Sequence, residues 1–354
     1  MRGLAMRFWL VFVTIVAVAF GATAAQAGEP ATPATIAGAT AAFDVVQAYE
    51  PKGVSSFAFI GPGGTYWLFA GNGPGGIETH SSADGLAWTK QSISGLPFGG
   101  SDISIVEYEP GRYRAYVAFL APTDPSAGRP TPCSGLSLRT ATSTDLRTWT
   151  AESGNGFADL GCGVPQVVKN PAGGYFMYWV SGERQGSHGS RLATSSDGHT
   201  FQTSGGLLIG TDLVDPSVIR LPDGSWLMAY ATFYNPMKGG DPFRDVGLAS
   251  SNDGISWSVA PKRVLDSTDR TRLDPTLLLL PDGRIRIYYS EYAVGLQEVM
   301  GATPTLRSAV ITLRAAPKVA AAKKKTTTIT CLKGTKTKKV TGTSPKCPAG
   351  WKQR

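Results

Sequence analysis

Val214-Asp-Pro-Ser-Val-Ile-Arg-Leu-Pro-Asp-Gly-Ser-Trp-Leu-Met-Ala-Tyr230 combines an apolar run, a Pro-Asp-Gly turn and a second, alternating run. The same pattern recurs as Leu273-Asp-Pro-Thr-Leu-Leu-Leu-Leu-Pro-Asp-Gly-Arg-Ile-Arg-Ile-Tyr-Tyr289. Alternation with a period of two places side chains on opposite faces of a strand, and Asp-Gly supplies the positive φ angles of a tight hairpin. A repeated hairpin predicts the blades of a propeller, because a single blade cannot bury its own faces.

Three further copies of this hairpin lie upstream and begin at Ser55, Asp102 and Gly163. A second repeat, with Ser, Asp and an aromatic residue at fixed spacing, follows four of the hairpins. Its copies are Ser82-Ala-Asp-Gly-Leu-Ala-Trp88, Ser143-Thr-Asp-Leu-Arg-Thr-Trp149, Ser195-Ser-Asp-Gly-His-Thr-Phe201 and Ser251-Asn-Asp-Gly-Ile-Ser-Trp257. Two repeats that interleave along the chain predict an all-β fold, a five-bladed β-propeller. The box aspartates, Asp84, Asp145, Asp197 and Asp253, are expected to tie outer turns.

The start of the chain has the pattern of a secretory signal peptide. Residues 1–27 carry Arg2 and Arg7, then an apolar run, and end in Ala25-Gln-Ala27. The run is too short to span a membrane. We therefore expect a secreted, extracellular protein without a membrane span after cleavage. We also expect it to be a monomer.

The remaining chain divides by composition. We expect a linker over 28–42, the propeller over 43–314, a second linker over 315–328 and a Lys-rich C-terminal module over 329–354. The segment from Phe43 to Tyr49 alternates weakly and is expected to supply the outer strand of the last blade. Such a strand would close the ring and remove an exposed sheet edge.

Four cysteines in an exported chain predict two disulfides, Cys133–Cys162 in the propeller and Cys331–Cys347 in the tail. Zinc is the rival explanation, but the sequence lacks Cys-x-x-Cys spacing, so no metal site is expected from the cysteines. The second disulfide would make the tail a short stapled module.

Positive charge is concentrated in the tail. Eleven of the 34 Lys and Arg residues lie in 318–354, which leaves the propeller slightly acidic. A Lys-rich segment favours anionic partners, and an anionic cell-wall polymer is the partner expected here. The alternative is a solvated tail with no partner. Nucleic acid is not expected outside the cell.

The Asp-Pro-Ser/Thr strand openings at Asp215 and Asp274, with the hairpins and boxes, resemble five-bladed glycoside hydrolases of the family 43 type, a clan that also includes invertases and levansucrases. The boxes are similar to the Asp boxes of sialidases, with one residue fewer. The resemblance implies hydrolysis of glycosidic bonds by an Asp/Glu acid–base pair acting on carbohydrate or polysaccharide. In that clan a first-blade Asp and a third-blade Glu are implied, and these positions are Ser55 and Gly163. The alternative is therefore a propeller that binds glycan without cleaving it, or a surface module held by its tail.

Three aspartates, Asp102, Asp215 and Asp274, each open a predicted inner strand and are expected at the mouth of the central channel. There they could act as a catalytic base, grip sugar hydroxyls or hold a Ca²⁺ ion, the one cofactor considered. The alternative is that each caps its own strand. Residues that break the repeat are the other candidates: Glu183 and Glu291 as the acid, and Ser55, His80, Arg184, His188, Tyr234 and Arg244 for substrate binding.

Overall fold

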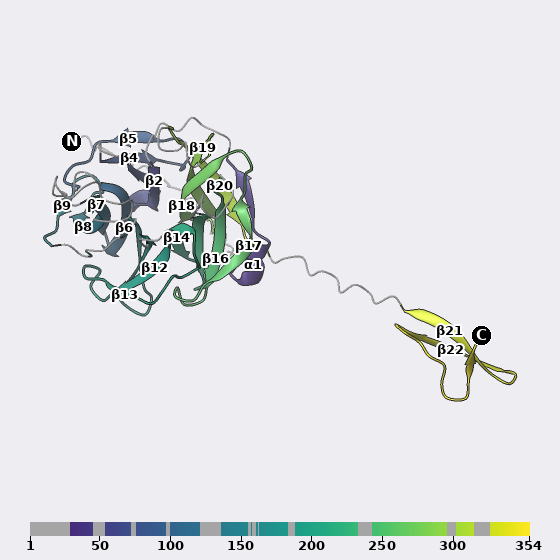
Figure 1. Cartoon of the computed structure of the whole chain (residues 1–354). Coiled ribbons are helices and arrows are strands. Elements are labelled where there is room, and N and C mark those ends of the chain that lie inside the picture. Colours follow the sequence, from purple (N-terminus) through teal and green to yellow (C-terminus); the bar gives the residue numbers. More distant parts are fainter. Residues whose placement is uncertain are drawn as a thin grey trace, which may run out of the picture.

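The computed structural model describes residues 29–44, 54–71, 76–96, 100–120, 136–154, 157, 161, 163–182, 188–232, 243–295, 302–314 and 326–354. These residues form five four-stranded antiparallel sheets and one three-stranded sheet. In Figure 1 the four-stranded sheets surround a common centre, as the blades of a propeller do. The predicted all-β, five-bladed propeller with a disulfide-stapled C-terminal tail is confirmed.

The five blades follow one another along the chain. Blade 1 contains β2 (Val54–Ile60), β3 (Tyr66–Gly71), β4 (Ile77–Ser82) and β5 (Thr89–Gln91). Blade 2 contains β6 (Gly100–Glu109), β7 (Arg112–Leu120), β8 (Leu136–Ser143) and β9 (Thr150–Ala151). Blade 3 contains β10 (Gly163–Lys169), β11 (Tyr175–Gly182), β12 (His188–Ser195) and β13 (Gln202–Ser204).

The last two blades complete the ring. Blade 4 contains β14 (Leu213–Arg220), β15 (Trp226–Thr232), β16 (Val246–Ser251) and β17 (Ser258–Leu265). Blade 5 contains β18 (Thr271–Leu279), β19 (Ile285–Tyr292), β20 (Thr305–Thr312) and the early strand β1 (Thr40–Phe43). The first strands β2, β6, β10, β14 and β18 contact one another in a closed circle, so they are the innermost strands.

The core is divided among the interfaces between neighbouring blades. Leu227 of blade 4 packs with Ile287 of blade 5, for example, and Leu68 of blade 1 packs with Tyr288 of blade 5. Each remaining pair of neighbouring blades has its own apolar cluster. Apolar residues on both faces of the strands are thereby removed from water, which a lone blade could not achieve.

The Ser–Asp boxes stabilise turns and also join the blades. In the first box Ser82 Oγ donates to Asp84 Oδ1 at 2.9 Å, and this oxygen accepts the N–H of Leu86 at 2.8 Å. The other three boxes repeat the arrangement. The structure thus agrees with the expectation that the box aspartates tie outer turns.

Each of three boxes also receives a buried tyrosine from the preceding blade. Tyr116, Tyr178 and Tyr288 donate their hydroxyls to the carbonyl oxygens of Gly198, Gly254 and Gly85 at 2.7, 2.7 and 2.8 Å. These glycines adopt φ between 68° and 74°. Such bonds satisfy polar groups that lie inside the interface between blades.

The N-terminal segment closes the ring. β1 pairs with β20 and places Thr40 opposite Thr312 and Phe43 opposite Ala309. This agrees with the expected closure at Phe43, although the strand ends at Phe43 instead of beginning there. Residues 45–50 lie outside the described part.

Residues 29–39 differ from the unpatterned linker that composition predicted. They include α1 (Pro33–Ala37), and Ile36 is buried in the apolar cluster of blades 4 and 5. The backbone N–H of Ala31 donates to Ser225 Oγ at 2.9 Å. Short runs of small apolar residues have no clear hydrophobic period, so the sequence of this segment did not predict that it packs on blades 4 and 5.

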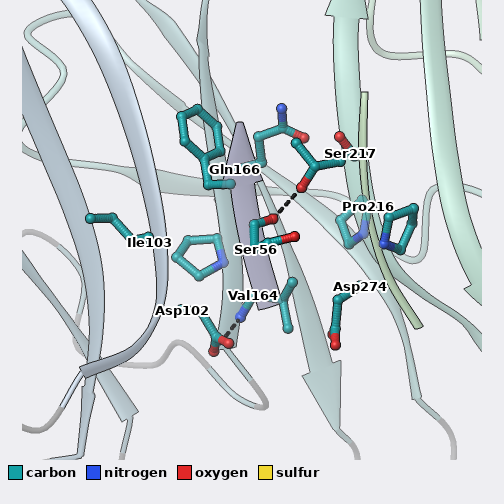
Figure 2. Close-up of a pocket in the computed structure, with 12 residues that line it drawn as sticks. Ser56, Asp102, Ile103, Val164, Gln166, Pro216, Ser217 and Asp274 are labelled. Atoms are coloured by element: carbon teal, nitrogen blue, oxygen red, sulfur yellow. Dashed lines mark hydrogen bonds between the residues drawn. The ribbon is translucent and has the colours of Figure 1, made fainter. Parts of the chain in front are cut away.

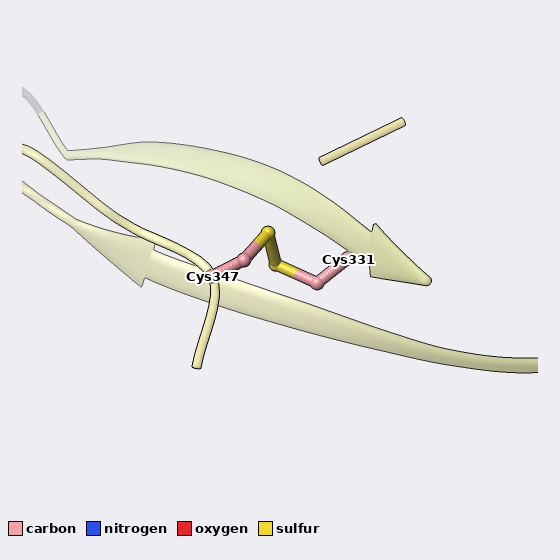
Figure 3. Close-up of a disulfide and its surroundings, with 2 residues drawn as sticks. All are labelled: Cys331 and Cys347. Atoms are coloured by element: carbon pink, nitrogen blue, oxygen red, sulfur yellow. A yellow bond between two sulfur atoms is a disulfide. The ribbon is translucent and has the colours of Figure 1, made fainter. Parts of the chain in front are cut away.

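The C-terminal residues form a separate three-stranded sheet in the order β22-β21-β23. Its strands are β21 (Thr327–Lys333), β22 (Lys336–Gly342) and β23 (Lys352–Gln353). A disulfide joins Cys331 to Cys347, as predicted (Figure 3). The predicted partners Cys133 and Cys162 lie outside the described residues. No helix in the described ranges has the length and apolar character needed to cross a bilayer.

Candidate functional site

Every inner strand begins with a β-bulge. The register shifts between Val54 and Phe57, Gly100 and Ile103, Gly163 and Gln166, Val214 and Ser217, and Leu273 and Thr276. In blades 3, 4 and 5 the bulge holds Val164, Asp215 and Asp274 at φ of 51°, 53° and 52°. Asp tolerates this left-handed conformation better than most residues, and a bulge re-aims its side chain away from the normal alternation.

A small pocket lies where the five inner strands meet. Residues from every blade line it: Ser56, Phe57, Asp102, Ile103, Val164, Pro165, Gln166, Pro216, Ser217, Asp274, Pro275 and Thr276. Its volume is about 30 Å³, which is enough for water but not for a sugar ring. Figure 2 shows the carboxylates of Asp102 and Asp274 directed to the same side, with Val164 between them. A larger ligand would therefore sit at the mouth of the channel on that side.

Asp102 is fixed by the neighbouring blade. Its carboxylate is buried, and Oδ2 accepts the backbone N–H of Val164 at 3.1 Å. A Cβ atom on Gly163 would lie only 2.6 Å from the same oxygen. The glycine at the position where the family resemblance implies an acid thus makes room for the carboxylate of Asp102.

Asp215 and Asp274, on adjacent blades, form a coupled pair. Burial is the main cause that raises the pKa of Asp215, to about 7, and the negative charge of Asp274 is the next. Asp102 adds a smaller effect in the same direction, whereas the Arg244 guanidinium and the N–H of Asp274 oppose it. Like charges close together favour retention of one proton by the pair.

Arg244 and Tyr292 lie near this pair, and His188 lies near Arg244. Arg244 is buried, and its burial lowers its pKa while Asp215, Asp274 and Tyr292 raise it. Burial also raises the pKa of Tyr292, and the charge of Asp274 adds to this. Burial and the charge of Arg244 lower the pKa of His188. These interactions indicate that a cation and a phenol lie close to the carboxylates and that an imidazole lies close to the cation.

Polar residues just past the bulges join the inner strands to one another. Ser104 Oγ accepts the N–H of Val167 at 3.0 Å, and Ser217 Oγ accepts the N–H of Leu277 at 2.8 Å. Gln166 bonds to both backbone groups of Val218, and Thr276 donates to the carbonyl of Ser56. Simple alternation predicted that Ser104, Ser217 and Thr276 would share the channel face with the aspartates. Ser217 and Thr276 line the pocket together with Asp102 and Asp274, and the hydroxyls of all three residues also bridge neighbouring blades.

The structure brings some predicted site residues together and separates others. Asp102 and Asp274 line the pocket, Asp215 and Arg244 interact with Asp274, and His188 interacts with Arg244. Glu291 is not among the residues that line the pocket, and its carboxylate contacts three guanidiniums, those of Arg272, Arg307 and Arg270 at 3.2, 3.3 and 3.5 Å. His80 is buried on the third strand of blade 1, opposite Leu68 of the cluster between blades 1 and 5.

Several predictions fall outside the described part of the chain. These are Glu183, Arg184, Tyr234 and the side chain of Ser55. Among the described residues, no group of three or more His, Cys, Asp or Glu side chains is arranged to hold a metal ion, so the suggested Ca²⁺ in the channel gains no support. Sequence reasoning missed Tyr292, which stands directly after the candidate Glu291.

Fold and site together define a class: a five-bladed propeller with a buried carboxylate cluster at its channel. The chain shows 12% identity and a TM-score of 0.55 with a thermostable family-43 glycoside hydrolase, over 75% of this chain and 95% of that one. An α-L-arabinofuranosidase from Lactobacillus brevis gives 15% identity, a TM-score of 0.55 and coverage of 74% and 94%. An endo-arabinase from Bacteroides thetaiotaomicron shows 17% identity and a TM-score of 0.55, over 77% of this chain and 98% of that one.

These likenesses show that the chain has the propeller fold seen in family-43 glycoside hydrolases. No protein-family model matches the sequence, and no curated protein matches it significantly. The solved structures that it resembles are thus similar in fold at very low sequence identity.

Proposed function

We propose that this protein is a glycoside hydrolase whose active site is the mouth of the propeller channel. The observation that carries the proposal is the coupled pair Asp215–Asp274, with Asp102 nearby. Glycosidic hydrolysis needs one carboxyl group that is protonated and another that is ionised at the same pH. The raised pKa of Asp215 supports this division at neutral pH.

The blade positions suggest how the roles divide. Asp215 and Asp274 stand on adjacent blades and share a proton, whereas Asp102 stands on blade 2, separated from both by one intervening blade. We assign the pair as the acid that protonates the glycosidic oxygen as the bond breaks. Asp274 delivers the proton, because it lines the pocket and is less buried than Asp215. Asp102 is the base that takes a proton from the attacking water.

Arg244, His188 and Tyr292 supply the remaining polar groups of the site. The positive charge of Arg244 limits the electrostatic cost of two carboxylates in one buried site. We assign His188, at the start of β12 and half-buried, to contact with sugar hydroxyls. Glu183 and Arg184 precede it in the chain, and Glu183 stays a prediction for a further acid.

The proposal is tested by sugar release. Purified protein is incubated with arabinan, arabinoxylan, galactan and aryl α-L-arabinofuranosides, chosen because the similar structures include an arabinofuranosidase and an endo-arabinase. Reducing ends or aryl alcohol are measured for wild type, Asp102→Asn and Asp274→Asn. Asp282→Asn is the matched control, because Asp282 is half-exposed or more and bonds Arg284 in a hairpin turn away from the pocket.

Turnover should fall by at least about 1000-fold in both site variants and stay within about twofold in the control. Folded Asp102→Asn and Asp274→Asn proteins with undiminished activity would refute the assignment. A folded wild type that binds glycans on an array but releases no sugar from any substrate would favour the non-catalytic alternative.

Export is proposed on separate grounds. Residues 1–27 have the signal-peptide pattern, and the docked N-terminal segment starts shortly after the expected cleavage site, with Ala31 bonded to Ser225. Cleavage before Gly28 would leave this docked segment intact. N-terminal sequencing of protein recovered from the culture medium tests the site; an intact Met1 on the exported protein would contradict it.

A further inference from the structure

The C-terminal module, residues 326–354, has a charge composition unlike that of the propeller. It contains seven Lys and Arg residues and no Asp or Glu. Its strands pair with one another in a sheet of their own, and the disulfide closes that sheet. The positive charge is therefore held on a small, ordered scaffold.

The strand register divides this sheet into two faces. Cys331 pairs with Lys338 on one side and with Gln353 on the other, so these side chains share a face. The disulfide brings the segment around Cys347 over that face, and Cys331 is fully buried (Figure 3). We call it the disulfide face; Lys333 and Lys336 belong to it by alternation.

The opposite face, called here the open face, has no such cover. Its cations are Lys339, Lys352 and Arg354, all of them exposed. The same face carries the hydroxyls of Thr328, Thr330, Thr337 and Thr341, of which the first and last bond each other at 2.7 Å. Cations beside a field of hydroxyls offer both charge attraction and hydrogen bonds.

We propose that the open face binds an anionic polysaccharide, a hydroxylated chain with repeated carboxylate or phosphodiester groups. Charge complementarity carries the choice of partner, because no acidic side chain in 326–354 opposes the cations. The threonines suit hydroxyl groups of a sugar chain. The one apolar side chain on this face, Leu332, is half-buried, so the face lacks the exposed apolar and aromatic groups by which proteins insert into lipid surfaces.

This binding site is independent of the proposed hydrolysis, since it uses no residue of the channel. It would hold the protein on an acidic polymer while the propeller acts on a separate carbohydrate. Binding should weaken as salt is added, because exposed charges are screened over about 10 Å at 0.1 M ionic strength.

The test uses the full mature chain and two variants with equal loss of charge. The open-face variant carries Lys339→Gln, Lys352→Gln and Arg354→Gln. The disulfide-face variant carries Lys333→Gln, Lys336→Gln and Lys338→Gln and is the matched control. Polygalacturonate supplies carboxylates, poly(glycerol phosphate) supplies phosphodiesters, and neutral dextran, anionic phospholipid vesicles and duplex DNA complete the set of probes. Affinity is measured by co-sedimentation at 50 and 300 mM salt.

Each cation facing an anionic surface contributes roughly fivefold to affinity, so the open-face variant should bind the acidic polysaccharides on the order of 100-fold more weakly. The disulfide-face variant should stay within about fivefold of wild type, because its charges act only at a distance. Whether polygalacturonate or poly(glycerol phosphate) binds more tightly identifies the anionic group.

Equal losses in the two variants would overturn the assignment of a face. Tighter binding to vesicles or to DNA than to either acidic polysaccharide would overturn the choice of partner. Retention of the Cys331–Cys347 disulfide and of slow amide exchange in β21 and β22 in both variants shows that each result reports on the lost charges and not on unfolding of the module.

Discussion

Asp215→Asn tests whether the buried carboxylate of Asp215, which the proposed hydrolysis uses, lowers the stability of the folded protein at neutral pH. Asp215 has an ordinary pKa of 3.8, and burial, followed by the charge of Asp274, raises it to about 7 in the folded protein. Folding therefore favours the protonated form. Below pH 3.8 both the folded and the unfolded states hold this proton, so the group has no effect on stability. Above pH 7 both states release it, and the folded state bears the full cost of a buried charge.

The size of this cost follows from the pKa difference. Between pH 4 and 7 the folded state binds more protons than the unfolded state, so the free energy of unfolding falls as the pH rises. A shift of about three units at roughly 1.4 kcal/mol each gives an upper bound of about 4 kcal/mol. Because Asp274 and Arg244 readjust when Asp215 is replaced, we expect Asp215→Asn to gain about 2 to 4 kcal/mol at pH 8 and almost nothing at pH 4. The same change should abolish turnover.

Urea denaturation of wild type and Asp215→Asn, followed by tryptophan fluorescence at pH 4 to 8, measures the effect, and the range is extended down to pH 2 for the control. Asp197→Asn is a control of opposite sign. Backbone N–H groups of Thr200 and His199 lower the pKa of Asp197 to about 2, so its stabilising effect is present above pH 4 and is lost as the pH falls toward 2. A stability difference between wild type and Asp215→Asn that does not grow from pH 4 to 8 would show that folding does not raise the pKa of Asp215.

Two further predictions concern the packing around the channel. Gly163→Ala should lower turnover at least about tenfold, because the new Cβ would lie 2.6 Å from Asp102 Oδ2 and because a φ of 88° strains any residue other than glycine. Unchanged turnover of a folded variant in kinetic assays would contradict this tight contact. Tyr178→Phe should reduce the free energy of unfolding by about 0.5 to 1.5 kcal/mol, because the buried carbonyl of Gly254 loses the shorter of its two hydrogen bonds and keeps the one from Trp257 Nε1 at 3.2 Å. An unchanged urea midpoint would show that this bond between blades is dispensable.

Sequence patterns were sufficient for the architecture. Hairpins with alternating polarity and Pro-Asp-Gly turns identified five blades, since a period-two pattern is local and depends on nothing outside the strand. The boxes were recognised for the same reason, because Asp84 and its equivalents bond backbone groups two and three residues away. The Cys331–Cys347 pair was identified from its isolation in a short tail.

Part of the site also followed from sequence. Asp102, Asp215 and Asp274 were predicted to converge because each opens an inner strand, and the structure places them at one channel. Their detailed environment did not follow, because it depends on neighbouring blades. The bulges turn Asp215 and Asp274 into the left-handed conformation, and Arg244 comes from the segment just before β16. Gly163, which has no side chain, leaves room for the carboxylate of Asp102.

The tertiary structure alone separated similar candidates. Glu291 and Asp274 both looked like carboxylates of the last blade, but three guanidiniums surround Glu291, whereas Asp274 lines the pocket. The residues around α1 looked like a tether, yet Ile36 is buried between blades 4 and 5. A strand's own pattern determines which of its faces is apolar. Which charged group or apolar surface that face then contacts depends on closure of the ring, because the contacting residues come from blades distant in sequence.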